Sequence, residues 1–185
     1  MPKTAERPAT YEDLLQVPEH MVAEIVNGEL IVSPRPGRSH ARAAGPLFRR
    51  IGNAFEDGDG GPGGWWIIFE PELHLGSDVF IPDMGGWRRE RVPEYPDAGG
   101  CEIAPDWACE VISPGSARID RVRKLPLYAH YGIVYTWLVD PVLRTIEAYR
   151  LEGSHYSLIG AYEGEEPARI EPFEAVELPL KALWL

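Results

Sequence analysis

Hydrophobic and polar residues follow patterns that change along the chain and mark its expected elements. Residues 22–26 and 29–33 are two short, mostly apolar runs on either side of Asn27-Gly28. Asn-Gly is the strongest short-range signal for a β-hairpin, because both positions of a type I′ turn need a positive φ. The sequence therefore predicts an N-terminal β-hairpin, preceded by a short helix over residues 11–16.

Two longer segments carry apolar residues at the spacing of a helix. Over residues 43–55 these recur every three or four positions, which places them on one stripe and leaves most of the arginines off it. Pro46 should kink this helix or mark its start. A second helix is expected over residues 117–131, with Pro126 inside it and Gly132 at its end.

Short runs of apolar and β-branched residues predict the remaining strands. They are residues 65–75, 78–84, 107–112, 135–139, 145–151 and 154–162. Residues 85–105 are rich in Gly, Pro and Arg and are expected to form a long connection. The order of hairpin, helices and strands indicates an α/β (α+β) fold with a mixed central β-sheet flanked by helices.

Length and composition bound the class of protein. With 185 residues and 44% hydrophobic residues, the chain suits a single domain over residues 1–185, with residues 1–9 as a flexible N-terminus. No apolar run is long enough to span a bilayer, and the first residues lack the apolar segment of a secretory signal. Two cysteines, Cys101 and Cys109, are too few for a disulfide framework. We therefore expect a cytoplasmic protein with reduced thiols.

The net charge of −11 argues against a generic nucleic-acid binder, because phosphate contacts need Lys and Arg. The positive charge is nevertheless concentrated in two places. Residues 35–55 hold five arginines and no acid, and residues 118–124 hold three arginines and a lysine against one aspartate. Solvated helix faces are the simpler interpretation of both stretches. The candidate nucleic-acid contacts within them are Arg38, Arg42, Arg121 and Arg123.

Three acidic residues occur where a hydrophobic core is expected. Glu24 lies within the apolar run 21–26, Asp83 follows Ile-Pro at the end of a predicted strand, and Glu110 lies within the run 107–112. A single acid in a strand can face solvent, but a buried carboxylate is costly unless it is paired or bound to a metal. Together the three acids favour a divalent cation. Oxygen ligands without clustered His or Cys suit Mg²⁺ or Mn²⁺ rather than Zn²⁺.

Two further residues are candidates for the same chemistry. Lys124 follows Glu110 by fourteen residues, early in the helix predicted over 117–131. Near a metal site its ammonium could neutralise phosphate charge or orient the attacking water, although a helix lysine is usually solvated. His40 stands at the start of the basic helix, where it could contact a phosphate or a metal-bound water. A histidine at that place is more often a cap or a surface residue.

Several motifs occur in an order and spacing that resemble a known family. They are Glu24-Ile25-Val26-Asn27-Gly28-Glu29-Leu30, Ser33-Pro34, His40, Pro82-Asp83, Ala104-Pro105-Asp106-Trp107, Glu110-Val111-Ile112-Ser113-Pro114, Asp120, Lys124-Leu125 and Tyr135-Thr136-Trp137-Leu138-Val139-Asp140-Pro141. This pattern resembles the Uma-type endonuclease family, which is part of the restriction-endonuclease-like, PD-(D/E)XK superfamily. The resemblance runs from about residue 10 to the tail.

The resemblance implies a restriction-endonuclease-like core with a metal site. In it, Asp83 and Glu110 coordinate Mg²⁺, and the backbone carbonyl of Val111 is a further ligand. Glu24 on the hairpin supports the site, and Lys124 supplies the catalytic amine.

One position departs from the superfamily pattern, which places the lysine two residues after the second acid, where this chain has Ile112. The family resembled carries its lysine on the following helix instead. That is the basis for assigning the catalytic amine to Lys124.

The favoured function is a metal-dependent endonuclease that hydrolyses phosphodiester bonds in DNA with Mg²⁺ or Mn²⁺. A homodimer is plausible, because cutting both strands needs two active sites. Two alternatives remain open. The first is a catalytically silent nuclease-fold protein that binds DNA or another partner. The second is a glycosidase that uses two carboxylates and no metal.

Overall fold

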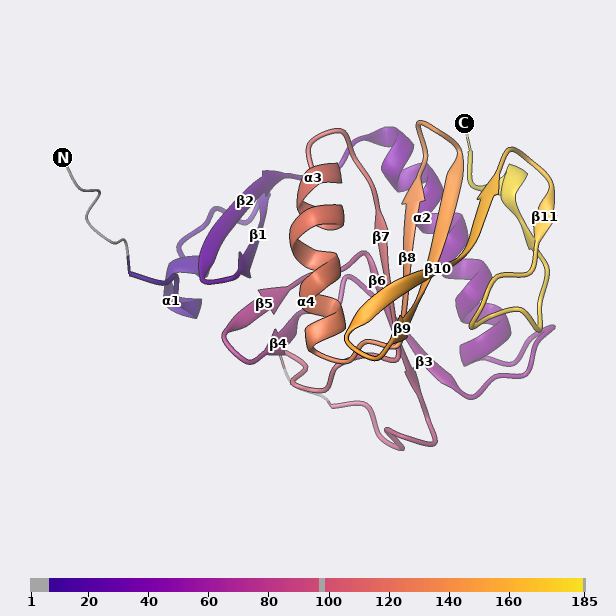
Figure 1. The fold of residues 1–185 in the computed structure, drawn as a ribbon, viewed down its shortest axis with the longest axis horizontal. Helices are drawn as coiled ribbons and strands as arrows, with labels where there is room; N and C mark the ends of the chain where they lie inside the picture. The colour runs from indigo at the N-terminus through magenta and orange to yellow at the C-terminus, as the bar shows by residue number, and fades with distance from the viewer. Residues whose placement is uncertain (1–6, 97–98, 185) are drawn as a thin grey trace.

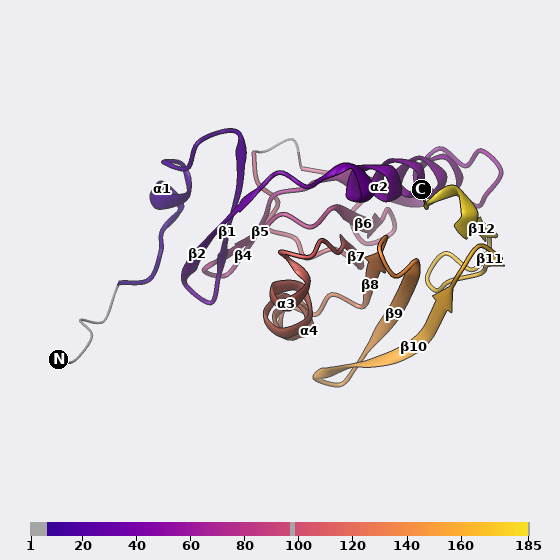
Figure 2. The same cartoon turned by 90° about the horizontal axis from the view of Figure 1, so that it is seen from above.

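The computed structural model describes residues 7–96 and 99–184, and Figures 1 and 2 show its arrangement from two sides. Its helices are α1 (Tyr11–Leu14), α2 (Arg38–Ile51), α3 (Ala117–Ile119) and α4 (Leu125–His130), with π-helical turns at Gly52–Glu56 and Asp120–Lys124 and a 3₁₀ turn at Leu180–Ala182. Its strands are β1 (Met21–Val26), β2 (Glu29–Pro34), β3 (Trp65–Phe69), β4 (Leu73–Leu75), β5 (Asp78–Phe80), β6 (Met84–Arg88), β7 (Trp107–Val111), β8 (Tyr135–Asp140), β9 (Thr145–Glu152), β10 (His155–Glu163), β11 (Pro167–Ala168) and β12 (Leu178–Pro179).

The strands form a large sheet, a small sheet and one short pair. The large sheet has the order β10-β9-β8-β7-β6-β3, and the small sheet has the order β2-β1-β5-β4. In the large sheet β7 and β8 are parallel, whereas the neighbouring pairs are antiparallel. The sheet is therefore mixed, as expected, and Figure 2 shows α2 on one side of it and α3 and α4 on the other.

The N-terminal hairpin is confirmed. β1 and β2 pair in register from Met21↔Pro34 to Val26↔Glu29, and Asn27 and Gly28 have φ values of 55° and 71°. Both turn residues thus occupy the left-handed region that the Asn-Gly signal requires.

The segment before the hairpin is attached to it. Of residues 1–9, expected to be flexible, residues 1–6 lie outside the described residues. The amide of Ala9 donates to the carbonyl of Gly28, and Arg7 forms an ion pair with Asp13 at 2.7 Å. The helix α1 (Tyr11–Leu14) is shorter than the predicted 11–16.

Both long helices form, with different boundaries. α2 begins at Arg38, so Pro46 lies inside the helix rather than at its start. The predicted helix 117–131 is a continuous run of α3, the π turn Asp120–Lys124 and α4, and Pro126 falls in the first turn of α4. Pro126 lacks a backbone amide and so interrupts the hydrogen bonds of this run, directly after the π turn.

The prediction for residues 65–105 was partly wrong. The expected strand 78–84 is divided between β5 in the small sheet and β6 in the large sheet, and residues 85–88 are strand rather than connection. The sequence predicts Gly85 and Gly86 in a connection, but in the structure tryptophan rings pack against both. A Cβ on Gly85 would approach the Trp87 ring to 2.7 Å, and one on Gly86 would approach the Trp107 ring to 3.1 Å.

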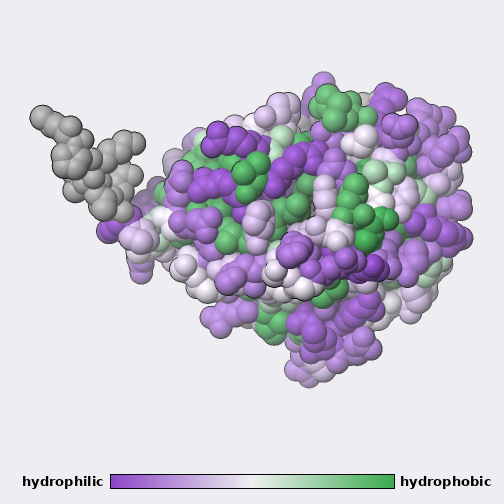
Figure 3. All heavy atoms as spheres, viewed as in Figure 1, coloured by the Kyte–Doolittle hydropathy of each residue, from purple (hydrophilic) through white to green (hydrophobic). Residues whose placement is uncertain are grey.

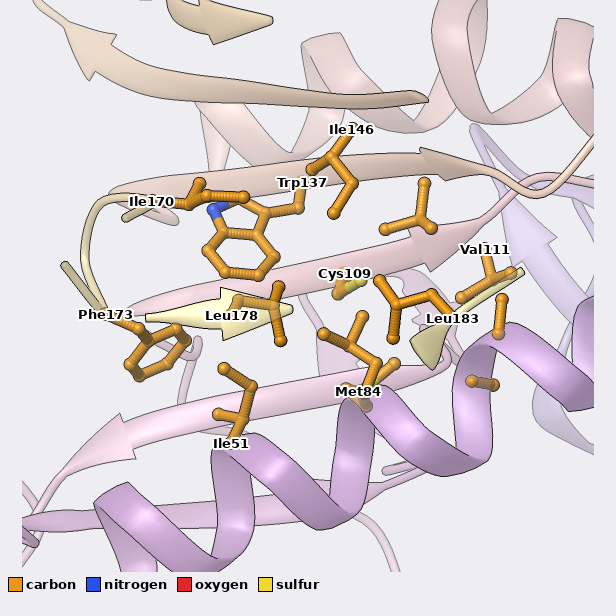
Figure 4. Close-up of a cluster of buried hydrophobic side chains, with 14 of the residues drawn as sticks. Ile51, Met84, Cys109, Val111, Trp137, Ile146, Ile170, Phe173, Leu178 and Leu183 are labelled. Carbon is orange, nitrogen blue, oxygen red and sulfur yellow. The ribbon is translucent and has the colours of Figure 1, made fainter. Parts of the chain in front are cut away.

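The main core lies between α2, the large sheet and the C-terminal segment. Figure 4 shows part of it, where Ile51 of α2 faces β6 and β7, and Trp137, Phe173 and Leu178 close the far end. Trp107 and Phe173 pack edge to face, with ring centroids 4.8 Å apart. Large aromatic groups of this kind bury much apolar area, and their contacts fix the position of β7.

Three further features concern the cysteines, the surface and the length of the helices. Cys101 and Cys109 are buried and have free thiols. Hydrophilic residues cover much of the face drawn in Figure 3, with smaller apolar patches between them. Within residues 7–96 and 99–184, no helix has the length and apolar composition needed to cross a membrane.

Candidate active site

The fold brings the predicted catalytic residues together in one cleft. Glu24 comes from β1, Asp83 from the link between β5 and β6, and Glu110 from β7, while Lys124 ends the π turn that follows α3. His40, Val111 and Asp120 line the same cleft, whose volume is about 510 Å³.

Asp83 is held by one contact at each of its oxygens. Its Oδ2 accepts a hydrogen bond of 2.7 Å from the backbone amide of Val111, and its Oδ1 lies 2.8 Å from Nε2 of His40. His40 is only 8% exposed, so it is not the surface residue that a helix start usually carries. The first turn of α2 is thus tied to the carboxylate, and Val111 contacts it through its amide.

Lys124 reaches the site. Its Nζ lies 2.7 Å from Oε1 of Glu110, 2.8 Å from Oε1 of Glu24 and 3.9 Å from Oδ1 of Asp120, and the residue is 2% exposed. A buried ammonium is stable only with such partners.

The geometry around Lys124 depends on the π turn. Within the turn the amide of Leu125 bonds to the carbonyl of Asp120, five residues back. A π turn inserts one extra residue into a helix and is often found at functional sites. Here the turn contains both Asp120 and Lys124, and both are buried.

Asp120 and Tyr128 belong to the same buried network, although Lys124 was the only residue of this helix that the sequence analysis assigned to the catalytic site. The hydroxyl of Tyr128 donates to Oε1 of Glu110, and Tyr128 has no exposed surface. Positions 120, 124 and 128 are four apart, which places them on one helix face. That spacing, read together with the lysine, is the signal that could have identified both residues.

Burial and mutual repulsion set the protonation of the cluster. Burial raises the pKa of Glu110 well above its ordinary value, and Asp120, Glu24 and Asp83 raise it further, while Lys124 acts in the opposite direction. Burial alone would lower the pKa of Lys124, but Glu110 and Glu24 outweigh it and raise that pKa. Lys124 therefore carries a positive charge that is too small to balance the carboxylates around it.

The donor set fits a hard divalent cation. The site offers carboxylate oxygens in excess of cations, which is the chemistry that Mg²⁺ prefers. Among the described residues, no group of three or more His, Cys, Asp or Glu side chains is arranged to hold a metal. Mg²⁺ commonly uses only one or two protein carboxylates and completes its shell with water and substrate phosphate. Asp83 and Glu110, with the carbonyl of Val111, would form a set of that kind.

The four candidate arginines divide into two groups. Arg38 and Arg42 are exposed on the first turns of α2, near His40. Arg121 pairs with Glu147 at 2.6 Å, and Arg123 pairs with Glu29 at 2.8 Å and also donates to the carbonyl of Val26. Arg121 therefore joins the π turn to β9, and Arg123 joins it to the β1–β2 hairpin.

Comparisons with known proteins identify the family and the fold of the chain. The family model "Uma2: Putative restriction endonuclease" matches residues 8–181. A solved structure described as "a putative nuclease belonging to DUF820 from Anabaena variabilis ATCC 29413" superposes with a TM-score of 0.74 at 22% sequence identity, over 95% of this chain and 97% of that one. The restriction-endonuclease-like fold is thus confirmed. A search of curated proteins finds no match.

Proposed function

Because the chain belongs to the Uma2 family of restriction-endonuclease-like nucleases, we propose that it is a Mg²⁺-dependent endonuclease that hydrolyses phosphodiester bonds in DNA. Mn²⁺ is a second metal that the same oxygen ligands suit. One observation carries the proposal. Four carboxylates, those of Glu24, Asp83, Glu110 and Asp120, line one cleft around the single ammonium of Lys124.

Each group has a role that follows from its contacts. Asp83 and Glu110 hold the metal, with the Val111 carbonyl as a third ligand. A bound Mg²⁺ would stabilise negative charge on the phosphate and lower the pKa of water. His40 keeps Asp83 in place through its 2.8 Å contact.

Lys124 and Glu24 act as a pair. Glu24 accepts from the amide of Ile81 at 2.8 Å and from Lys124 at the same oxygen, so it fixes the position of the ammonium. Held between Glu24 and Glu110, the Lys124 ammonium would donate a hydrogen bond to a phosphate oxygen of the bound substrate. Arg38 and Arg42 contact the nucleic-acid backbone beside the cleft, while Arg121 and Arg123 keep a structural role.

The alternative is a nuclease-fold protein without activity, which binds DNA or another partner. The net charge of −11 favours it, because strong nonspecific affinity for DNA is then not expected. The contacts of Lys124 with Glu24 and Glu110, and the position of Asp83 in the same cleft, favour the enzyme. The family match gives no support to the glycosidase interpretation.

The deciding experiment measures nicking of supercoiled plasmid and cleavage of single-stranded circles at low salt, with Mg²⁺, Mn²⁺ or chelator. We expect metal-dependent cleavage by the wild type and none by Asp83→Ala. Asp78→Asn is the matched control, since Asp78 is another buried acid (4% exposed) that does not line the cleft. A folded wild type that binds Mn²⁺ but cuts neither substrate would favour the inactive alternative.

The expected homodimer is a separate proposal, because two active sites are needed only to cut both strands of a duplex. Sedimentation equilibrium of the wild type measures it directly. A monomer that nicks one strand at a time would contradict the dimer without affecting the proposed chemistry.

A further inference from the structure

The cleft has two chemically different walls. One consists of the carboxylates with Lys124. The other is apolar and comes from the chain between α1 and the middle of β1. Its residues are Leu15, Val17, Pro18, Met21 and Val22.

The apolar wall begins directly beside the ion pairs. Val22 and Glu24 are two residues apart in β1, so their side chains are on the same face of the strand. Glu24 contacts Lys124, and Val22 therefore lies next to the charged cluster. Farther along the wall, Leu15 is 61% exposed. An exposed apolar surface inside a polar cleft is a typical binding feature.

Charge in the cleft disfavours a ligand held by phosphate contacts alone. Its acidic lining residues are Glu19, Glu24, Glu70, Glu72, Asp83, Glu110 and Asp120, against Arg35 and Lys124 as the basic ones, besides His40. Lys124 is already held by carboxylates, and Arg35 donates to the backbone carbonyl of Glu19 at 3.2 Å. Duplex binding depends on several Lys and Arg contacts to phosphates, so this lining is poorly suited to it.

The size of the cleft points to one nucleotide. Its volume of about 510 Å³ is within the range of about 300–1,000 Å³ for pockets that enclose a single small ligand. Enzymes that take an unpaired nucleotide into such a pocket pack its base between aromatic or apolar side chains. A base on the apolar wall would leave its phosphate beside the carboxylates and Lys124.

Resting on the proposed function, we infer that the cleft takes one unpaired nucleotide, with its base packed on Leu15, Val17 and Val22, and that the substrate is single-stranded DNA. The base supplies affinity that the acidic cleft cannot obtain from phosphates. The inference assigns a base-binding role to the segment that joins α1 and β1.

The experiment measures binding by fluorescence anisotropy in Mg²⁺, in an Asp83→Asn background. The probes are a labelled thymidine oligonucleotide and a chain of equal length without bases. We expect the parent protein to prefer the thymidine strand by about tenfold, which is about 1.4 kcal/mol and corresponds to roughly 55 Å² of apolar surface removed from water, less than one fully buried side chain. Leu15→Ser combined with Val22→Ser should remove most of that preference. The control is Leu143→Ser, since Leu143 is 67% exposed and does not line the cleft.

Leu15→Ser alone keeps the test available if the double variant does not fold, because this position is exposed. The inference is overturned if the base-free chain binds as tightly as the thymidine strand, if both cleft variants bind like the control, or if a duplex of the same length binds as tightly as the single strand. A base preference without any cleavage by the wild type would support this subsite and remove the proposed activity. Cleavage without a base preference would support the proposed activity and overturn the base-binding subsite.

Discussion

Lys124 is the residue on which the charge balance of the site depends, because it is buried and its polar neighbours are acidic. Replacing it by Met should destabilise the metal-free protein by about 3–5 kcal/mol, since the change leaves buried carboxylates without a counter-charge. Mg²⁺ should restore more stability to Lys124→Met than it adds to the wild type. Urea denaturation with and without Mg²⁺ measures both effects.

The control for this prediction is Arg121→Met, which removes a half-exposed ion pair with Glu147 and should cost at most about 1 kcal/mol. A Lys124→Met variant as stable as the wild type without metal would show that the cluster is neutralised by its own protons instead.

Tyr131 provides a prediction for alkaline pH. Its hydroxyl donates to Asp78 at 2.7 Å, and Asp78 in turn accepts from the amide of Asn27 at 2.6 Å. Burial, followed by the bond to Asp78, raises the pKa of Tyr131 from 10.0 to about 12. The folded protein therefore holds this proton more tightly than the unfolded chain, so Tyr131 contributes stability that is complete below pH 10.0 and is lost as the pH rises towards about 12.

Tyr131→Phe should be less stable than the wild type at neutral pH, because it lacks the hydrogen bond to Asp78, and should lose less stability between pH 10.0 and about 12. Phenolate absorbance and denaturation across the same pH range test it together. Identical alkaline profiles for the two proteins would contradict the predicted role of Tyr131.

At the scale of elements, the two basic segments should respond differently to substitution. Arg38→Ala and Arg42→Ala, on α2, should each reduce the slope of log affinity for single-stranded DNA against log salt by about 0.7, as expected for one lost phosphate contact. Arg121→Ala and Arg123→Ala should leave that slope unchanged, because their guanidiniums pair with Glu147 and Glu29. Equal slope changes for all four variants would show that the ion pairs open when DNA binds.

Elements with local signals were predictable from the sequence. The hairpin depends on Asn27-Gly28, and the helix over 117–131 depends on its own periodicity, so neither needed distant contacts. β6 was not predictable, because Gly85 and Gly86 are poor strand formers by themselves. Tertiary packing decides their conformation, since rings from Trp87 and Trp107 occupy the space that side chains would need. The division between β5 and β6 also arises from sheet assembly rather than from local preference.

The site could be predicted in part. Acids within apolar runs identified Glu24, Asp83 and Glu110, and their convergence follows from the topology. The distance from Lys124 to these acids was not accessible from the sequence, because it depends on a π turn that no residue type encodes. Asp120 and Tyr128, in contrast, could have been identified from their spacing of four residues on either side of Lys124.

At the scale of the whole molecule, the charged network joins the two sheets. Glu24 belongs to the small sheet, whereas Glu110 belongs to the large sheet, and Lys124 bridges them. Tryptophans in β3, β6, β7 and β8 report on the large sheet, and amide exchange in β1 reports on the small one. In the wild type both probes should give the same unfolding free energy.

In Lys124→Met we expect the opening free energy from β1 amide exchange to be lower than the unfolding free energy from tryptophan fluorescence. Native-state hydrogen exchange measures this separation. If β1 already opens independently in the wild type, the hydrophobic contacts and the ion pairs together are too weak to couple the sheets.

The distribution of the site over the sequence also has a consequence for synthesis. The first carboxylate, Glu24, leaves the ribosome early, but Lys124 follows a hundred positions later, and β7 needs β8 as its parallel neighbour in the sheet. A nascent chain therefore carries acids without the ammonium and without the sheet that positions them. The hydrolytic site that we propose would therefore be complete only when most of the protein has been made.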